Sequence, residues 1–256
     1  MAEVEHPGLV EFYAEHRNQV ADLYPSERRF LPWLAKSSDT ILDVGCAAGG
    51  FADIWSAFNP DLRYSGIDHS ATLIDAARNL HPECTFLVGD CAAGLPLGDR
   101  SSIAVSALGW LFWEPRYREA LAELWRLSER FLLIDLRLHF GPEDVVGRQI
   151  IMPGENVPYI CVSWAGALKT LLSLKPSRLL GYGYFGTTNP GVSGIAHEVA
   201  FATFVLEREP GPSRRTEVCL DLPFDVPPEL ASTITLYPGH RLRSFAPAEA
   251  EGGRDT

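Results

Sequence analysis

The sequence predicts an α/β fold in which an open parallel sheet carries helices on both faces. Two observations support this prediction. Five short apolar runs alternate with amphipathic helical segments between residues 40 and 138, as in successive strand–helix units of a doubly wound sheet. The first of these runs also ends in a glycine-rich turn, at the edge of the sheet where such folds bind ligands.

Two helical segments precede the sheet. Residues 9–20 place Leu9, Phe12, Tyr13, His16 and Val20 at helical spacing. Residues 26–35 predict a second, shorter helix that Pro32 interrupts. The apolar run Thr40–Gly45 is then the first buried strand.

Strands and helices alternate after the first strand. Ser70 is expected to cap the second helix of this region, because its side chain can accept a hydrogen bond from the first helical turn. Pro115 opens the third helix. The predicted helices cover residues 51–58, 71–80 and the segment from 115, and the predicted strands cover 63–68, 85–88, 102–108 and 131–138.

The pattern loosens after residue 138. Residues 140–160 are expected to be an inserted loop, either a lid or an inert surface insertion, and 164–174 a helix. Closing strands are predicted at 178–185 and 199–207, with shorter β-like stretches at 217–220 and 232–236. We therefore expect a helical cap over residues 1–37, a central domain over 38–207 with an insertion and helix over 140–175, and an extension over 208–256 whose end, 246–256, is disordered.

Charge and composition exclude several classes of protein. The chain has 256 residues, and 22 basic against 33 acidic side chains give a formal net charge of −11. This charge argues against binding to nucleic acid. No signal peptide and no run of 18 apolar residues is found, so we expect no membrane span and a cytoplasmic location. The five cysteines include no C-x-x-C pair, which argues against disulfides and against a metal site.

Three features along the chain predict a nucleoside-binding site. A glycine-rich turn over residues 45–50 follows the first strand, Asp68 ends the second, and Asp90 follows the third. A carboxylate at Asp68 can accept both hydroxyls of a ribose, and one at Asp90 can accept an adenine amino hydrogen. Either acid alone fits a helix N-cap or a solvated turn equally well. We expect Asp68 to lie at an exposed strand end, so that Asp68→Ala weakens cofactor binding and changes folding little.

At these positions the sequence resembles the class I S-adenosylmethionine-dependent methyltransferases. The resemblance rests on ILDVGCAAGG (41–50), YSGIDHS (64–70), LVGDCAAGLPL (87–97) and SIAVSALGW (102–110). It implies a seven-stranded Rossmann-like sheet, mostly parallel with the last strand antiparallel, and S-adenosylmethionine as cofactor with S-adenosylhomocysteine as product. Ala47 stands where the family more often has glycine. The implied cofactor-binding residues are Asp43, Gly45, Cys46, Ala47, Gly49, Asp68, His69, Asp90, Cys91, Ala107, Leu108 and Tyr13.

The segment FYAEHRNQVADLYPSERRFL (12–31) resembles the helical lead-in of bacterial small-molecule methyltransferases. Such segments commonly cover the cofactor, which would place Tyr13, Arg17 and Tyr24 near it. The alternative is that these side chains only pack the helix on the sheet.

Methyl transfer to a hydroxyl needs a general base, and the candidates follow the later strands. His139 directly follows the fifth strand and is our first candidate; His197, before the last strand, is the second. Asp135, inside the fifth strand, is expected to be an internal hydrogen-bonding residue. The acceptor pocket should be aromatic, with candidates Trp110, Phe112, Trp113, Tyr182, Tyr184 and Phe185.

The sequence thus predicts methyl transfer to a small-molecule acceptor, by O- or N-methylation, for example of a sugar or natural-product intermediate. One alternative is a protein that binds S-adenosylmethionine without transferring its methyl group and serves as a scaffold or partner. A nicotinamide-dependent oxidoreductase fits less well, because the turn reads G-x-A-x-G-G and no Tyr-x-x-x-Lys pair occurs. We expect no metal requirement and no membrane or nucleic-acid partner, and the sequence leaves the oligomeric state open.

Overall fold

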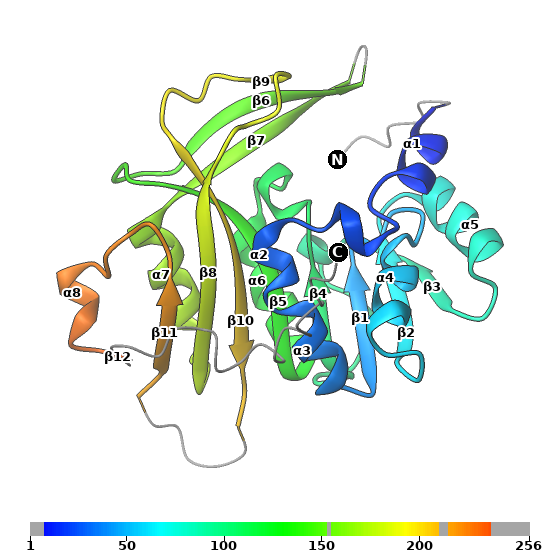
Figure 1. Ribbon diagram of the computed structural model, residues 1–256, viewed down its shortest axis with the longest axis horizontal. Helices are drawn as coiled ribbons and strands as arrows, with labels where there is room; N and C mark the ends of the chain where they lie inside the picture. The colour runs from blue at the N-terminus through cyan, green and yellow to red at the C-terminus, as the bar shows by residue number, and fades with distance from the viewer. Residues whose placement is uncertain (1–7, 153–154, 210–214, 237–256) are drawn as a thin grey trace, which may run out of the picture.

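A single mixed sheet runs through the molecule, and its strand order confirms the predicted fold class (Figure 1). The computed structural model describes residues 8–152, 155–209 and 215–236. Within the described residues the main sheet has the order β12-β11-β8-β10-β5-β4-β1-β2-β3, which is nine strands where seven were expected, because β11 and β12 extend it beyond β8. Its strands are β1 (Thr40–Val44), β2 (Arg63–Asp68), β3 (Thr85–Val88), β4 (Ser102–Ala107), β5 (Ser128–His139), β8 (Arg178–Gly186), β10 (Val199–Glu207), β11 (Glu217–Asp221) and β12 (Thr235–Leu236).

The directions of the strands also agree with the prediction. β1 pairs in parallel with β2 and β4, and β3 and β5 extend the sheet in parallel on either side. β10 is antiparallel to both β5 and β8, as expected for residues 199–207. All nine residues of β10 are buried, which explains why this segment is apolar on both faces.

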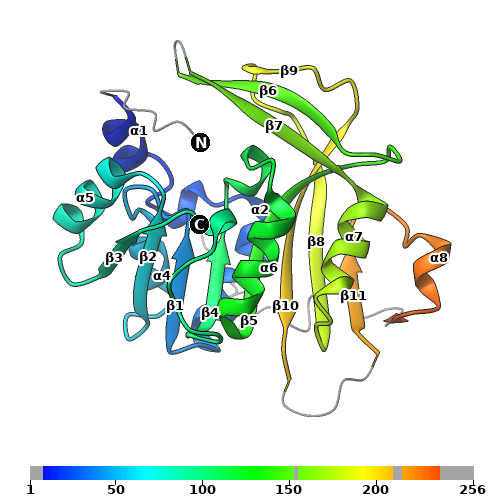
Figure 2. The same ribbon diagram turned by 180° about the vertical axis from the view of Figure 1, so that it is seen from behind.

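Helices cover both faces of the sheet (Figures 1 and 2). On one face α3 (Leu31–Lys36), α4 (Phe51–Phe58) and α5 (Ala71–Leu80) pack around Trp55 and Ile74. On the other face α6 (Tyr117–Leu127) and α7 (Trp164–Ser173) pack around Leu121 and Leu168. The Ser70 hydroxyl accepts a hydrogen bond from the Leu73 amide and caps α5, as the sequence predicted.

The segment 140–160 is not a loop, and here the prediction was wrong. It forms the hairpin of β6 (Val145–Met152) and β7 (Glu155–Ser163), which rises over the carboxyl edge of the sheet together with β9 (Val192–Ser193) (Figure 1). Leu138 and His139 of β5 pair with Val162 and Ser163 of β7. Besides pairing with each other, β6 pairs with β9 and β7 pairs with β5. These two partners are remote in sequence, so local patterns do not reveal them.

The two ends of the chain depart from the predicted elements in smaller ways. The first helix, α1, covers only Leu9–Glu15, because the backbone of His16 is extended; Arg17 after it is left-handed with φ of 60°. The chain continues through a 3₁₀ turn (Val20–Asp22) into α2 (Pro25–Arg28). At the other end, β11 joins the sheet beside β8, and α8 (Pro228–Ala231) follows. The predicted disordered end, 246–256, lies outside the described residues.

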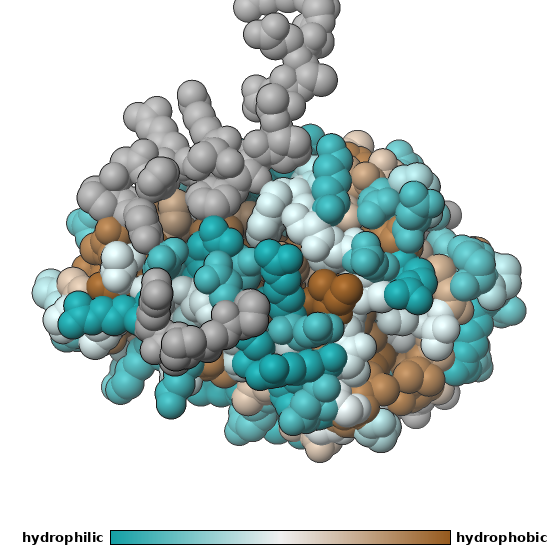
Figure 3. Space-filling view, turned by 90° about the horizontal axis from the view of Figure 1, so that it is seen from below, coloured by the Kyte–Doolittle hydropathy of each residue, from teal (hydrophilic) through white to brown (hydrophobic). Residues whose placement is uncertain are grey.

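Figure 3 shows the edge of the sheet away from the β6–β7 hairpin, where the amino ends of the parallel strands lie. Hydrophilic residues there are interspersed with hydrophobic ones. None of the helices in the described part of the chain has the length and apolar character needed to cross a membrane.

The carboxylate of Glu207 joins three strands near this edge. It is fully buried and accepts hydrogen bonds from Arg130 of β5 at 3.1 Å and from Nε of Arg178 of β8 at 2.9 Å. Replacing Glu207 by Gln removes the charge that both guanidinium groups contact. We expect the free energy of unfolding in urea to fall by about 1–3 kcal/mol. Glu129→Gln, at an exposed position of β5, should change it by less than about 0.5 kcal/mol; equal effects of the two substitutions would contradict this prediction.

Candidate functional site

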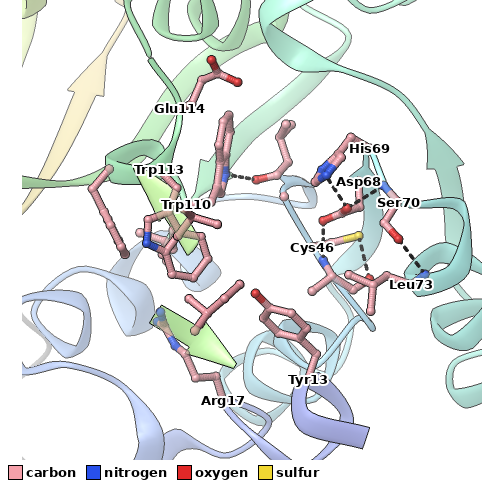
Figure 4. A pocket seen from close by; sticks show the side chains of 18 of the residues that line it. Tyr13, Arg17, Cys46, Asp68, His69, Ser70, Leu73, Trp110, Trp113 and Glu114 are labelled. Carbon is pink, nitrogen blue, oxygen red and sulfur yellow. Dashed lines mark hydrogen bonds and ion pairs between the residues drawn. The ribbon is translucent and has the colours of Figure 1, made fainter. Parts of the chain in front are cut away.

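A cavity of about 800 Å³ opens at the carboxyl edge of the sheet, where the sequence predicted a ligand site. Its size is within the range of small-molecule sites. The turns after β1, β2, β3 and β4 form one end of the cavity, α1 and the following segment form its side, and the β6–β7 hairpin covers it. Figure 4 shows Tyr13 pointing its hydroxyl toward the middle of the cavity, with Asp68 and His69 on one side and Trp110 and Trp113 on the other.

Asp68 fixes the shape of the glycine-rich turn. One carboxylate oxygen accepts the Ala47 amide at 2.9 Å, and the other accepts the Ser70 amide at 2.9 Å. His69 adds an ion pair with this carboxylate at 3.3 Å. Only 6% of Asp68 is exposed. The expectation that Asp68 lies at an exposed strand end was therefore wrong. Because backbone amides from two segments depend on this side chain, we now expect its loss to affect folding as well.

The turn itself has left-handed backbone at three positions. Gly45 and Gly49 have φ of 80° and 85°, and Ala47 has φ of 48°, a conformation that glycine adopts more easily. The indole of Trp110 packs where a Cβ of Gly45 would lie, and its Nε1 donates to the Val44 carbonyl at 2.6 Å. Because it has no Cβ, Gly45 leaves room for the Trp110 indole and can also adopt a positive φ.

The second predicted acid, Asp90, also lies in the cavity wall. One of its oxygens accepts the Ala92 amide at 3.0 Å, and the other pairs with Arg116 at 2.9 Å. These contacts lower the pKa of Asp90 despite its partial burial, so that it is ionised at neutral pH. Several further predicted residues line the cavity, namely Tyr13, Gly45, Cys46, Ala47, His69, Cys91 and Leu108.

Three predicted cofactor residues are not among those that line the cavity. Asp43 is buried under the turn and accepts hydrogen bonds from Ser106 at 2.7 Å and Tyr64 at 2.8 Å. Gly49 faces the rings of His81 and Phe86. Ala107 is fully buried at the end of β4. These three residues lie behind the cavity wall, because alternate positions of a strand or turn face the core.

The segment before the sheet contributes the side of the cavity. Tyr13, Arg17 and Tyr24 all line it, as the first interpretation of that segment predicted. Arg17 forms an ion pair with the buried Glu27 at 2.5 Å and stacks over the rings of Tyr24 and Phe51, each with its centroid 5.0 Å from Cζ. Burial, with Asp68 nearby, raises the pKa of Tyr13 to about 12 and keeps its hydroxyl protonated.

The other end of the cavity is aromatic and contains residues that sequence reasoning missed. Of the predicted aromatics, Trp110, Phe112 and Trp113 line it, whereas Tyr182, Tyr184 and Phe185 do not. The missed residues are Arg137 of β5, Gln149 and Tyr159 of the hairpin, and Phe201 of β10. The signal for Arg137 was present in the run FLLIDLRL, where Asp135 and Arg137 are two charged residues on one face of an otherwise apolar strand.

Comparisons with known proteins agree with this geometry. Residues 41–130 match the family described as "Methyltransferase domain". The chain also resembles trans-aconitate 2-methyltransferase of Yersinia pestis (strain Pestoides F), with 32% identity over 80 residues, which is 31% of each chain. The chain carries a class I S-adenosylmethionine-dependent methyltransferase domain. Both the expected family and its cofactor class are thereby confirmed.

Solved structures support the fold of this methyltransferase domain. The N-terminal domain of EvdMO1, crystallised in the presence of SAH and D-fucose, superposes with a TM-score of 0.56 at 14% identity, covering 82% of this chain and 98% of that one. The [4+2]-cyclase SpnF gives a TM-score of 0.51 at 16% identity, covering 72% and 81%. These likenesses concern the fold alone. The sequence match spans less than a third of the length of the curated relatives.

The residues around the cavity fit the cofactor of this class. Asp68 and Asp90 supply carboxylates for hydroxyl and amino hydrogens, and Leu108 supplies an apolar wall. Arg17 supplies a cation at the side of the methyltransferase domain, and its Nε has no hydrogen-bond partner within the described residues. This set of donors and acceptors matches a nucleoside joined to an amino acid.

The two histidines predicted as bases do not line the cavity. Only 1% of His139 is exposed, and its Nδ1 accepts the Gly141 amide at 3.0 Å. Its ring stacks on His197 with centroids 4.9 Å apart, and burial together with this neighbour lowers its pKa. Two residues earlier on the same face of β5, Arg137 lies in the cavity wall instead. His139 and His197 are therefore not placed to act as a base on a ligand in the cavity.

Asp135 is buried as expected and accepts the Gly109 amide at 2.7 Å and Nη1 of Arg137 at 2.8 Å. In the ranges 8–152, 155–209 and 215–236, no group of three or more His, Cys, Asp or Glu side chains is placed to hold a metal ion. The absence of a metal requirement stays a prediction.

Burial raises the pKa of Asp43 to about 6, against the lowering effect of the Ser106 and Tyr64 hydrogen bonds. The folded protein then binds this proton more tightly than the unfolded chain does. As pH falls from 7 to 4, wild type should therefore gain on the order of 2 kcal/mol in free energy of unfolding relative to Asp43→Asn. Urea titrations at several pH values measure this difference. Asp39→Asn, at an exposed position, should show no such trend, and a constant difference between wild type and Asp43→Asn would contradict the prediction.

Proposed function

We propose that this chain transfers the methyl group of S-adenosylmethionine to a small-molecule acceptor held beneath the β6–β7 hairpin. The observation that carries the proposal is the continuity of the cavity. It runs from the carboxylates of Asp68 and Asp90 to the aromatic wall of Phe112, Tyr159 and Phe201. A cofactor and an acceptor can therefore share one continuous space, which is what direct transfer requires.

The cofactor end would be held by the turns of the methyltransferase domain. S-adenosylmethionine, when bound, supplies a methyl group on a positively charged sulfur. Asp68 would accept the ribose hydroxyls, and Asp90 would accept the adenine amino group. Arg17 would pair with the carboxylate of the methionine portion, and Tyr13, on α1, would help to exclude water from that side.

The acceptor end favours catalysis by positioning. The histidines of the cavity wall are His16, which stacks on Phe12, and His69, which pairs with Asp68. Burial raises the pKa of Tyr159 to about 12, so its hydroxyl is a donor at neutral pH and not a base. An acceptor that is already ionised, such as a carboxylate, needs no proton removal. The curated relatives are trans-aconitate methyltransferases, which makes trans-aconitate and other carboxylic acids the first acceptors to assay.

The test is a turnover assay that measures S-adenosylhomocysteine released from purified protein and S-adenosylmethionine. The panel of acceptors contains trans-aconitate, aromatic and aliphatic carboxylic acids, phenols and amines. We expect product above the no-acceptor background with at least one small molecule. Tight binding of S-adenosylhomocysteine without turnover across the panel would instead support a protein that binds the cofactor without transfer. The SpnF structure, named as a cyclase, shows that this fold is not restricted to methyltransferases.

Asp68→Asn tests the cofactor end. The variant loses the charge that would accept two ribose hydroxyls, so we expect S-adenosylhomocysteine binding to weaken by roughly 2–4 kcal/mol in calorimetry. Folding stability should fall as well, by about 1–3 kcal/mol, because Asp68 also accepts two backbone amides. Asp75→Asn, at an exposed position of α5, is the matched control. Unchanged affinity in a folded Asp68→Asn protein would show that the ribose binds elsewhere.

A further inference from the structure

The acceptor end of the cavity contains a buried cation that the binding of S-adenosylmethionine does not require. Arg137 is 2% exposed, yet it lies in the cavity wall. The rings of Phe112 and Phe201 each lie with their centroids 4.2 Å from its Cζ. Because two aromatic rings cover the guanidinium, its N–H groups can act only in directions that the rings leave open.

The hydrogen bonds of Arg137 are incomplete. Its Nη1 donates to Asp135 at 2.8 Å, and Tyr159 interacts with it from the hairpin. Its Nε has no hydrogen-bond partner within the described residues. Asp135, by contrast, uses both carboxylate oxygens, since it also accepts the Gly109 amide. A buried guanidinium with five donors that contacts one carboxylate and one hydroxyl is short of acceptors.

Other polar side chains of the cavity wall are also donors. The amide oxygen of Gln149 accepts a hydrogen bond from Nε1 of Trp113 at 2.9 Å, so the N–H groups of Gln149 can donate to a ligand. The amide oxygen of Asn189 accepts the Gly191 amide at 2.9 Å, with the same consequence. Tyr159 keeps its hydroxyl proton, as described above. Another acid of the cavity wall, Glu114, already accepts hydrogen bonds from the amide and Nε of Arg116.

We propose that the acceptor carries a carboxylate, which binds at Arg137 with help from Gln149 and Tyr159. A carboxylate is planar and matches a guanidinium covered on its faces by Phe112 and Phe201. A phosphate would bring a larger charge against an arginine that Asp135 already neutralises. The aromatic wall then contacts the apolar body of the acceptor. The inference rests on the proposed function only in taking the bound carboxylic acid to be the methyl acceptor, because carboxylate binding itself is measured without turnover.

The experiment compares matched pairs of acid and amide, among them phenylacetate with phenylacetamide, cinnamate with cinnamamide, and hexanoate with hexanamide. Binding to the full chain, saturated with S-adenosylhomocysteine, is measured by calorimetry. We expect at least one acid to bind roughly 10- to 100-fold more tightly than its amide, the range for a hydrogen bond to a charged group. If no acid of the set is preferred over its amide, the proposal is overturned on wild-type protein alone.

Variants then locate the site. Arg137→Gln alone leaves Asp135 buried without its cation and can fail to fold, so the double variant Asp135→Asn, Arg137→Gln is used, which removes both charges. The preference for acid over amide should fall to nearly one in the double variant. It should fall roughly three- to tenfold in Gln149→Leu and stay unchanged in Arg63→Gln, an exposed arginine at the start of β2. A preference that survives in the double variant would assign the carboxylate to another cation and overturn the proposal.

The two proposals fail in distinguishable ways. Loss of the proposed function appears as no binding of S-adenosylhomocysteine or no turnover, both measured without the acid and amide pairs. If the cofactor product does not bind, the pairs are titrated into protein without it, and the role of Arg137 is still decided.

Discussion

The architecture of the site depends on the carboxylate of Asp135. This side chain lies inside β5, the strand that β4 and β10 flank on both sides, and it accepts hydrogen bonds from the Gly109 amide and from Arg137. The first bond fixes the turn after β4, where the cavity begins, and the second holds a cation at the acceptor end. Asp135 also acts electrostatically on Arg17 of the preceding segment. A single buried acid thus links three walls of the cavity, since a buried charge must be compensated by its neighbours.

Asp68 plays the corresponding role at the cofactor end. By accepting the Ala47 and Ser70 amides, it joins the glycine-rich turn of β1 to the start of α5. Its carboxylate is therefore oriented before any ligand binds, and preorganisation of this kind lowers the cost of binding. Because the same side chain stabilises the fold, we expect substitutions there to affect both folding and ligand binding.

The β6–β7 hairpin brings residues of the segment after β5 to the cavity. It pairs with the last residues of β5, and its residues Gln149 and Tyr159 line the cavity. The acceptor end gains hydrogen-bond donors from this hairpin and no base. The hairpin also covers the aromatic wall, and polar contacts in such partly buried surroundings are stronger than in bulk water.

The sequence by itself determined the parallel core and the order of the cofactor groups. The turn at 45–50, Asp68 and Asp90 each follow a strand that local apolar patterns define, and parallel strands bring their carboxyl ends to one edge. Only the tertiary structure decided which side chains of β5 and its neighbours lie in the cavity. The alternation of a strand assigns Asp135, Arg137 and His139 to one face, but which segment covers each of them depends on pairing between strands far apart in the chain. Arg137 lies in the cavity wall, whereas the His139 ring is covered by the ring of His197, 58 residues later in the chain, a contact that no local pattern encodes.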